Sequence, residues 1–264
     1  MDLGLSGRSA LVCGASSGMG LAIAQGLAAE GAAVLLVARR AEALDQACAG
    51  IRAAHPGARI AALAADLTQP DAPAAAVAAA QGHFGAVDIV VTNTGGPPPG
   101  QPLDLGDDKF LLAHEQNFMN VVRICRAAVP GMRERRWGRV INLLALSVRQ
   151  VEDNLTLSGT SRTAVVAYAK YLSDQVAADG VTVNNVLPGS VHTERLETVS
   201  AMQARHFGRD PGQELDARRA RVPARRLGDP REMADLVCFL ASDRAGFLTG
   251  LSIPVDGGQL RSVL

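Results

Sequence analysis

The stretch CGASSGMG, residues 13–20, decides how this chain is expected to fold. It joins an apolar run, SALVC at 9–13, to an alanine-rich segment, GLAIAQGLAAEG at 20–31. Glycines let a backbone turn tightly and approach a phosphate, and a helix that begins there offers free N–H groups. The spacing is GxxxGxG and not the GxGxxG of the generic dinucleotide motif, so the turn alone also suits a simple helix cap.

Apolar runs and helical segments alternate outward from this turn along the whole chain. Seven runs are typical of strands: 9–14, 33–38, 58–66, 87–93, 138–145, 181–189 and 251–258. Strands that are apolar almost throughout are buried on both faces, as in a parallel sheet between helices. The pattern predicts an α/β fold of the Rossmann type, a doubly wound parallel seven-stranded sheet with helices on both faces. We expect a single domain over 1–264.

Composition argues against several classes of partner. Lys+Arg and Asp+Glu both number 26, so nothing indicates binding to nucleic acid or to an anionic membrane. The four cysteines are scattered without a CxxC, and no metal site is expected. The start of the chain shows no signal segment, and no apolar run is long enough to span a bilayer. We therefore expect a soluble cytoplasmic protein with reduced thiols.

Four further motifs follow the glycine turn in order: NTG at 93–95, Asn117, PG at 188–189 and DGG at 256–258. Together with GxxxGxG they span the chain and resemble the short-chain dehydrogenase/reductase family. The resemblance is strongest to members that are like 3-oxoacyl-(acyl-carrier-protein) reductase. It implies a nicotinamide cofactor bound along the carboxyl edge of the sheet.

The resemblance also implies cofactor roles for particular residues. Gly14, Gly18 and Gly20 would line the pyrophosphate, and Asp66 would meet the adenine. Asn93 and Gly95 would wall the adenosine side, while Pro188, Gly189 and Thr193 would hold the nicotinamide end. The neighbouring positions complete the expected cofactor-binding set: Ser16, Ser17, Met19, Leu67 and Thr94.

The end of the second strand favours NADP over NAD. An acidic residue there would bind the ribose 2′-hydroxyl of NAD, whereas arginine suits a 2′-phosphate. This chain has Arg39 and Arg40 and no acid at that place. We assign the phosphate to Arg39, with Arg40 stacking or assisting; two solvated loop arginines are the alternative.

The catalytic residues depart from the family pattern. The resemblance implies a tyrosine and a lysine four apart on one helix, with the tyrosine as general acid or base. It also implies a serine after the fifth strand and an asparagine on the preceding helix. Tyr168 and Lys170 are two apart, so on a helix they point roughly 200° apart. They cannot act as that pair.

The family's spacing from the sixth strand instead leads to Ser158, with Arg162 four residues later. Residues four apart lie on one helical face. Ala145 stands where the catalytic serine belongs, and Ser147 is a possible stand-in. Asn117 matches the helix asparagine. The expected catalytic residues are thus Asn117, Ser147, Ser158 and Arg162, of which Arg162 is also assigned to the cofactor ribose.

Two segments lie beside this expected site. The arginine-rich stretch at about 191–226 corresponds to the family's substrate lid, and it either receives an anionic acyl carrier or is a solvated helix with interleaved acids. His192, at its start, is either a proton donor or a solvated residue. The loop TGGPPPGQPL at 94–103 is too rich in proline for a helix or a central strand. It is either a substrate contact or a structural corner.

Two functions are compatible with these residues. One is an NADP(H)-dependent oxidoreductase that interconverts a carbonyl, such as an acyl-type ketone, and an alcohol with an atypical proton relay. The other is a catalytically impaired NADP-binding homologue that acts as a sensor or partner subunit. The resemblance implies a homo-oligomer, a tetramer or a dimer, built partly through the helix that contains 157–170.

Overall fold

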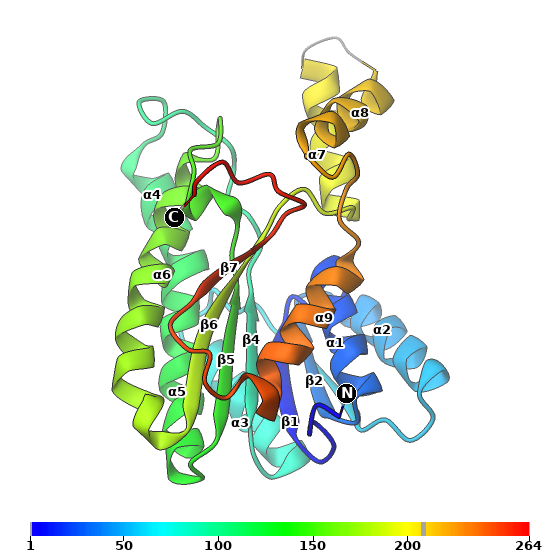
Figure 1. The fold of residues 1–264 in the computed structure, drawn as a ribbon, viewed down its shortest axis with the longest axis vertical. Coiled ribbons are helices and arrows are strands. Elements are labelled where there is room, and N and C mark those ends of the chain that lie inside the picture. The colour runs from blue at the N-terminus through cyan, green and yellow to red at the C-terminus, as the bar shows by residue number, and fades with distance from the viewer. Residues whose placement is uncertain (1, 207–209, 264) are drawn as a thin grey trace.

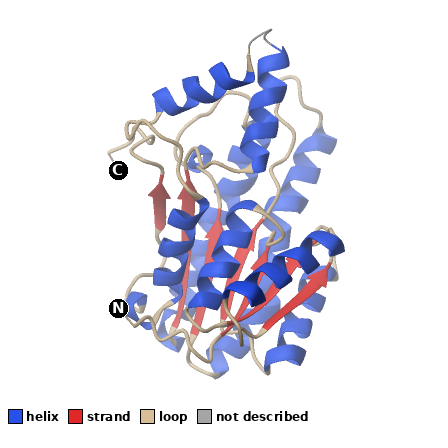
Figure 2. Ribbon diagram, turned by 90° about the vertical axis from the view of Figure 1, so that its right-hand side faces the viewer, coloured by secondary structure: helices blue, strands red, loops and turns tan. Residues whose placement is uncertain are grey.

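A computed structural model describes residues 2–206 and 210–263. Seven strands form one fully parallel sheet in the order β3-β2-β1-β4-β5-β6-β7, with helices in front of it and behind it (Figure 2). The strands are β1 Ser9–Cys13, β2 Ala33–Ala38, β3 Ile60–Ala64, β4 Ile89–Asn93, β5 Gly138–Leu143, β6 Val181–Pro188 and β7 Ser252–Val255. The predicted fold class and all seven predicted strands are confirmed.

The helices alternate with these strands along the chain. They are α1 Gly18–Ala29, α2 Ala41–Ala54, α3 Ala72–Phe84, α4 Asp107–His114, α5 Asn120–Glu134, α6 Thr156–Val176, α7 Glu194–His206, α8 Pro211–Arg221 and α9 Pro230–Ala241. A π-helical turn, Glu115–Met119, joins α4 to α5 without a break in the helical path. Sequence features explain two of the helix starts: Asp210 caps α8, and Asp229 forms a capping box with Glu232 at α9.

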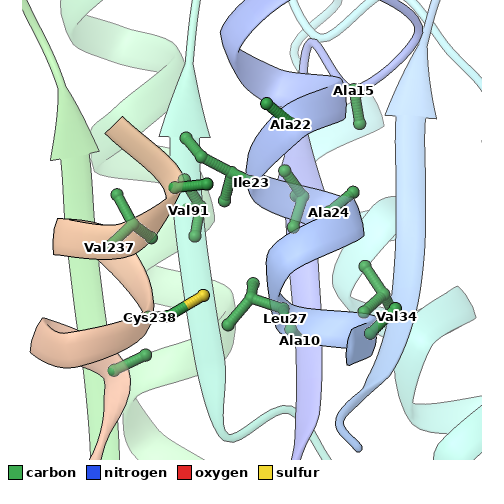
Figure 3. Close-up of a cluster of buried hydrophobic side chains, with 14 of the residues drawn as sticks. Ala10, Ala15, Ala22, Ile23, Ala24, Leu27, Val34, Val91, Val237 and Cys238 are labelled. Atoms are coloured by element: carbon green, nitrogen blue, oxygen red, sulfur yellow. The ribbon is translucent and has the colours of Figure 1, made fainter. Parts of the chain in front are cut away.

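Two hydrophobic clusters hold the layers together, one on each face of the sheet. The first includes Ile23 and Leu27 of α1, which pack between the strands and Val237 and Cys238 of α9 (Figure 3). The second joins α3, α5 and α6 to the opposite face, with Met132 fully buried. Strands β1 and β2 contribute to both clusters because their residues alternate between the two faces.

Polar side chains continue across the four strands on the β4 side of the sheet. Thr92 is in register with Asn142, Asn142 with Asn185, and Asn185 with Ser252. Each hydroxyl or amide bonds to the next, at 2.8, 2.9 and 3.0 Å. The ladder satisfies groups that would otherwise be buried without partners, and it ties these strands together below the carboxyl edge of the sheet.

The segment α7–α8 stands beyond the carboxyl ends of the strands, away from the layers of the sheet and its helices (Figure 1). The chain returns from α8 to α9 through a loop in which Gly228 pairs with Val191, a residue of the segment that leads into α7. The loops after β1, β4, β5 and β6 open on the same edge, because all strands of the sheet run in parallel. In such folds ligands bind at this edge.

Candidate active site

Ser158 and Arg162 lie together on the buried face of α6. Their exposed fractions are 5% and 6%, and the Arg162 Nη1 donates to Ser158 Oγ at 2.5 Å. The Arg162 Nη2 also donates to the backbone oxygen of Thr94, at 3.3 Å, in the loop after β4. The spacing of four residues therefore brings the two side chains together on one face of the helix, as periodicity predicts.

Asn117 extends this network from the π-helical turn. Thr94 Oγ1 donates to Asn117 Oδ1 at 2.6 Å, and Asn117 Nδ2 donates to Ser161 Oγ at 3.1 Å. We call Thr94, Asn117, Ser158, Ser161 and Arg162 the Arg162 network. A π turn displaces the side chains around it and is often found at functional sites. Here it carries Asn117, 1% exposed, toward α6.

Ser161 is a member that the sequence did not reveal. Its hydroxyl donates to the backbone oxygen of Leu157 at 2.6 Å while it accepts from Asn117. A serine in mid-helix often bonds backward in this way, so its position carries no distinguishing signal in the sequence. Its partner becomes evident only when the π-helical turn Glu115–Met119 is packed against α6.

The Arg162 guanidinium is a buried charge with incomplete partners. Its Nε has no hydrogen-bond partner, although the other two nitrogens donate. Burial, and then the cation of Arg195, lower the pKa of Arg162 from 12.5 to about 10. No carboxylate among the described residues raises it. The group stays protonated at neutral pH, so it supplies charge and hydrogen bonds.

Ser147 lies close to this pair, in a short 3-10 turn after β5. Its Oγ is buried without a partner, and its backbone oxygen lies against Gly159 of α6. A Cβ at Gly159 would be 3.2 Å from that oxygen. The hydroxyl of Ser147 is therefore free to bond to a ligand at the same edge, and Ala145 offers no such group.

Tyr168 and Lys170 lie outside the network. Tyr168 packs edge-on against Phe118 with ring centroids 6.0 Å apart, and burial, first, and nearby Cys125, second, raise its pKa. Lys170 is exposed and pairs with Asp174 at 2.7 Å. The two side chains serve packing and the surface, as their spacing of two predicts.

The glycine turn after β1 is shaped by its own neighbours. Gly14 and Gly18 have φ of 62° and 55°. A Cβ on Gly20 would collide with the Gly14 backbone oxygen, and one on Gly14 would lie 2.7 Å from Asn93 Nδ2. Asn93 donates to the Gly14 oxygen at 3.5 Å. Without side chains here, the backbone of the turn is bare toward the edge of the sheet.

The N-terminus of α1 opens on this bare turn. Ser17 precedes the helix in an extended conformation and makes no side-chain cap bond. The first N–H groups of a helix lack intrahelical partners and attract anions. Thr193, in the loop between β6 and α7, lies against this turn, 3.4 Å from the position of a Gly18 Cβ. These features fit a nucleotide pyrophosphate.

Arg39 and Arg40 follow β2 and are exposed, and Asp66 follows β3 beside them. Asp66 accepts from Thr68 N at 3.0 Å and from Thr68 Oγ1 at 2.9 Å. These bonds, and more weakly Arg39, lower the pKa of Asp66. Arg39 thus lies near an acid that is already held by Thr68, so its guanidinium remains available to a phosphate. Next to Asp66, Leu67 is buried.

The remaining predicted cofactor residues line the same edge. A Cβ on Gly189 would lie 2.7 Å from Asp256, and Gly189 N donates to Val255 O at 3.0 Å. Gly95 is open, with nothing within 4 Å of a Cβ position. The other members lie in the turn after β1 and at the end of β6: Ser16, Ser17, Met19 and Pro188.

The histidine at the start of the arginine-rich stretch 191–226 has a partner of its own. His192 is exposed, and its Nε2 lies 2.8 Å from Glu197 Oε1. Among the described residues, no group of three or more His, Cys, Asp or Glu side chains is arranged to hold a metal ion. In the same part of the chain, no helix has the length and hydropathy needed to cross a membrane.

Known proteins match this chain over nearly its whole length. A family model described as enoyl-(acyl carrier protein) reductase matches residues 14–259. The chain belongs to the short-chain dehydrogenase/reductase family. Among curated members it is 32% identical to the 3-oxoacyl-(acyl-carrier-protein) reductase FabG of Vibrio cholerae, over 97% of this chain and 99% of that protein.

Solved structures of this family have the same fold. L-sorbose reductase from Gluconobacter frateurii, complexed with NADPH and L-sorbose, matches with a TM-score of 0.94 at 32% identity and covers 100% of both chains. An actinorhodin polyketide ketoreductase with NADPH matches with a TM-score of 0.91 at 32% identity, over 97% of this chain and 98% of the other. Oxidoreductase chemistry is thus the activity of the dehydrogenase/reductase relatives named here.

Proposed function

We propose that this chain is an NADP(H)-dependent oxidoreductase that transfers a hydride between nicotinamide and a carbonyl or alcohol substrate through an atypical proton relay. The observation that carries the proposal is the Arg162 network. Buried hydrogen bonds run from Ser158 through Arg162 and Thr94 to Asn117, on the edge where the glycine turn lies. A network of this kind is costly to bury and is retained where it serves a site.

The residues present fit the cofactor. The bare turn of Gly14 and Gly18 and the uncapped start of α1 would hold the pyrophosphate. Arg39 would bind the 2′-phosphate, and Arg162 and Thr193 would lie at the nicotinamide end. When bound, NADPH supplies the hydride. NADPH is present in the sorbose reductase and ketoreductase complexes that this chain resembles.

Ser158 would donate the proton that the alkoxide oxygen of the substrate needs. Arg162 donates to Ser158 Oγ at 2.5 Å, and this positive charge favours the oxyanion left when the hydroxyl gives up its proton. Arg162 does not itself transfer the proton. Asn117 and Thr94 hold the arginine and the loop in place, and water restores the Ser158 hydroxyl. Ser147, buried with a free Oγ, is the second candidate donor.

The remaining expectations belong to the same proposal. The chain 1–264 would act as one domain in the cytoplasm, with 191–226 covering the substrate. It would assemble as a homotetramer or a homodimer. The exposed aromatics Tyr171 of α6 and Phe247 near β7, 80% and 102% exposed, support contacts through these two surfaces. Light scattering after size-exclusion chromatography would give the mass of the assembly.

A second function is favoured by one observation. The tyrosine position of the family is occupied by Ser158, whose hydroxyl is a far weaker acid than a phenol, and general acid–base help is typically worth about 10²–10⁴-fold in rate. A chain with this loss and an intact nucleotide turn could bind NADP and act as a sensor or a partner subunit.

Nucleotide binding and turnover distinguish the two functions. NADPH and NADH are titrated by calorimetry or by nucleotide fluorescence. Tryptophan fluorescence is a poor reporter, because Trp137 lies between Arg8 and Arg139, at the opposite end of the sheet from the glycine turn. Tight NADPH-selective binding with turnover of carbonyl compounds supports the oxidoreductase. NADPH binding without turnover supports the sensor function, provided that the double variant Ser158→Tyr/Arg162→Lys then reduces carbonyl compounds. Binding of neither nucleotide refutes both.

A further inference from the structure

Two arginines from different elements converge on one loop beside the Arg162 network. Arg162, from α6, donates to the backbone oxygen of Thr94 at 3.3 Å. Arg195, from the first turn of α7, donates to the backbone oxygen of Gly96 at 3.2 Å. The two acceptors are two residues apart, in the loop that follows β4. The two cations are close enough for Arg195 to disfavour the charge on Arg162.

Neither cation is neutralised by an acid among the described residues. Elsewhere in this region arginines are paired: Arg226 with Glu232 at 2.6 Å, and Arg219 with Asp216 at 2.6 Å. Arg162, 6% exposed, has a buried Nε with no hydrogen-bond partner in the described part of the chain. Burying a charge is costly unless it is paired. This cost applies to Arg162, whereas Arg195 is exposed to solvent beside it. An anion bound at this edge would therefore be attracted by a buried, uncompensated charge and could be contacted by an exposed one.

The loop leaves room for that anion. A side chain at position 96 would collide with the Arg195 guanidinium, so glycine is what lets Arg195 lie over the backbone there. The following prolines, Pro97, Pro98 and Pro99, restrict the backbone and fix the carbonyl that Arg195 holds. A guanidinium has five N–H donors, so one bond to Gly96 leaves others to form a planar pair with a carboxylate.

The phosphates of the proposed cofactor do not account for this pair of charges. They belong to the turn at Gly14–Gly18 after β1 and to Arg39 after β2. Arg162 and Arg195 lie instead on the side of β4, β5 and β6, where the proposed substrate oxygen would meet Ser158. A negatively charged group on the substrate would meet both arginines at this place.

We infer that the carbonyl substrate carries a carboxylate, which Arg195 binds above Gly96 and which the unneutralised charge of Arg162 attracts. The inference rests on the proposed function and names its substrate class, an oxo acid or the matching hydroxy acid. Arg195 is the specificity-determining residue. Arg162 both supports the proton donor Ser158 and supplies positive charge that attracts the carboxylate.

The test compares acids with their uncharged esters. Acetoacetate and 2-oxobutyrate, with longer 2- and 3-oxo acids up to eight carbons, are assayed beside their methyl esters with NADPH. We expect kcat/KM to be higher for the acids. Arg195→Gln should lower it for the acids by about 10- to 100-fold, the size of a lost charge-assisted hydrogen bond, and by less than about twofold for the esters.

Two further variants make the test specific. Gly96→Ala should reproduce the selective loss, because the new methyl group displaces the Arg195 guanidinium while residue 195 itself stays an arginine. Arg221→Gln removes an exposed arginine at the end of α8, on the same segment, and should leave both substrate classes unchanged. Binding is measured separately as the shift in melting temperature that acetoacetate, but not methyl acetoacetate, produces in the protein without cofactor.

The outcomes separate this inference from the proposed function. Equal use of acids and esters, equal loss of both in Arg195→Gln, or no acid in the panel that binds or reacts would overturn the carboxylate assignment. A melting shift by acetoacetate that Arg195→Gln removes, in a protein that binds no nucleotide and reduces nothing, would leave the anion site standing while the oxidoreductase proposal falls.

Discussion

Replacing Arg162 with methionine should stabilise the protein without ligand while it abolishes activity. Core substitutions usually destabilise by about 0.5–3 kcal/mol. Arg162 differs because it is 6% exposed, has an unpartnered Nε and lies near another cation instead of an acid. Methionine has a similar length and no charge, so it fills the space without the cost of desolvation.

The expected gain follows from the pKa of Arg162. A value of about 10 instead of 12.5, at about 1.4 kcal/mol per unit, means that folding the charged side chain costs about 3 kcal/mol. The proton is bound less tightly in the folded chain, so this cost is fully present below pH 10 and disappears as the pH rises toward 12.5. The variant loses two hydrogen bonds, to Ser158 and Thr94, each worth about 1 kcal/mol. The net gain is about 1 kcal/mol, or about 2–4 °C in Tm.

Arg139 provides the matched control. It is also buried, 4% exposed, but it donates to the carbonyls of Ser242, Gly138 and Gly180 at 3.2, 2.9 and 3.2 Å. It also stacks on Trp137, at 4.3 Å from the ring centroid. Arg139→Met removes these three hydrogen bonds and the stacking contact, so it should destabilise the protein by about 2–4 kcal/mol.

The assay is equilibrium urea unfolding of both variants at pH 7, followed by circular dichroism. The reasoning predicts opposite signs for arginine-to-methionine changes at two buried positions of one protein. If Arg162→Met loses 2 kcal/mol or more, as Arg139→Met should, then the Arg162 charge is compensated in the folded protein. The carboxylate inference would lose its electrostatic basis at the same time.

Three other perturbations test the site. Arg39→Glu should weaken NADPH binding by about 10- to 100-fold and leave NADH within about threefold, measured by nucleotide fluorescence, and equal weakening of both would exclude Arg39 as the phosphate ligand. Tyr168→Phe should leave turnover within about twofold and lower the free energy of unfolding in urea by less than about 1 kcal/mol, through its lost bond to Cys125. A large fall in kcat would contradict the assignment of Ser158, and not Tyr168, to the site. Gly20→Ala should destabilise the protein by about 1–3 kcal/mol, since the new methyl group meets the Gly14 oxygen. It should weaken the binding of NADPH and NADH equally, and an unchanged melting temperature would refute this packing.

Local sequence was enough to predict the fold, and with the family resemblance it indicated where a site is expected. Runs such as 33–38 and 138–145 are apolar throughout, and such runs are stable only when helices cover both faces of the sheet. The edge strand Ile60–Ala64 is half-exposed and shorter than the predicted 58–66, because it has a neighbour on one side only. Ser158 was predicted from the spacing that the family resemblance implies before the sixth strand, and Arg162 from helical periodicity, which is fixed by the backbone itself.

Tertiary structure decided the partners and the charge balance. Nothing in the sequence indicates that Asn117 bonds to Ser161, or that Arg195 of α7 reaches the loop after β4. These contacts join residues 44 and 99 positions apart. They depend on how helices rotate and pack on the sheet, which periodicity does not specify. Whether a carboxylate or another cation lies near Arg162 is likewise decided by the three-dimensional arrangement, because electrostatic energy depends on distance and burial and not on order along the chain.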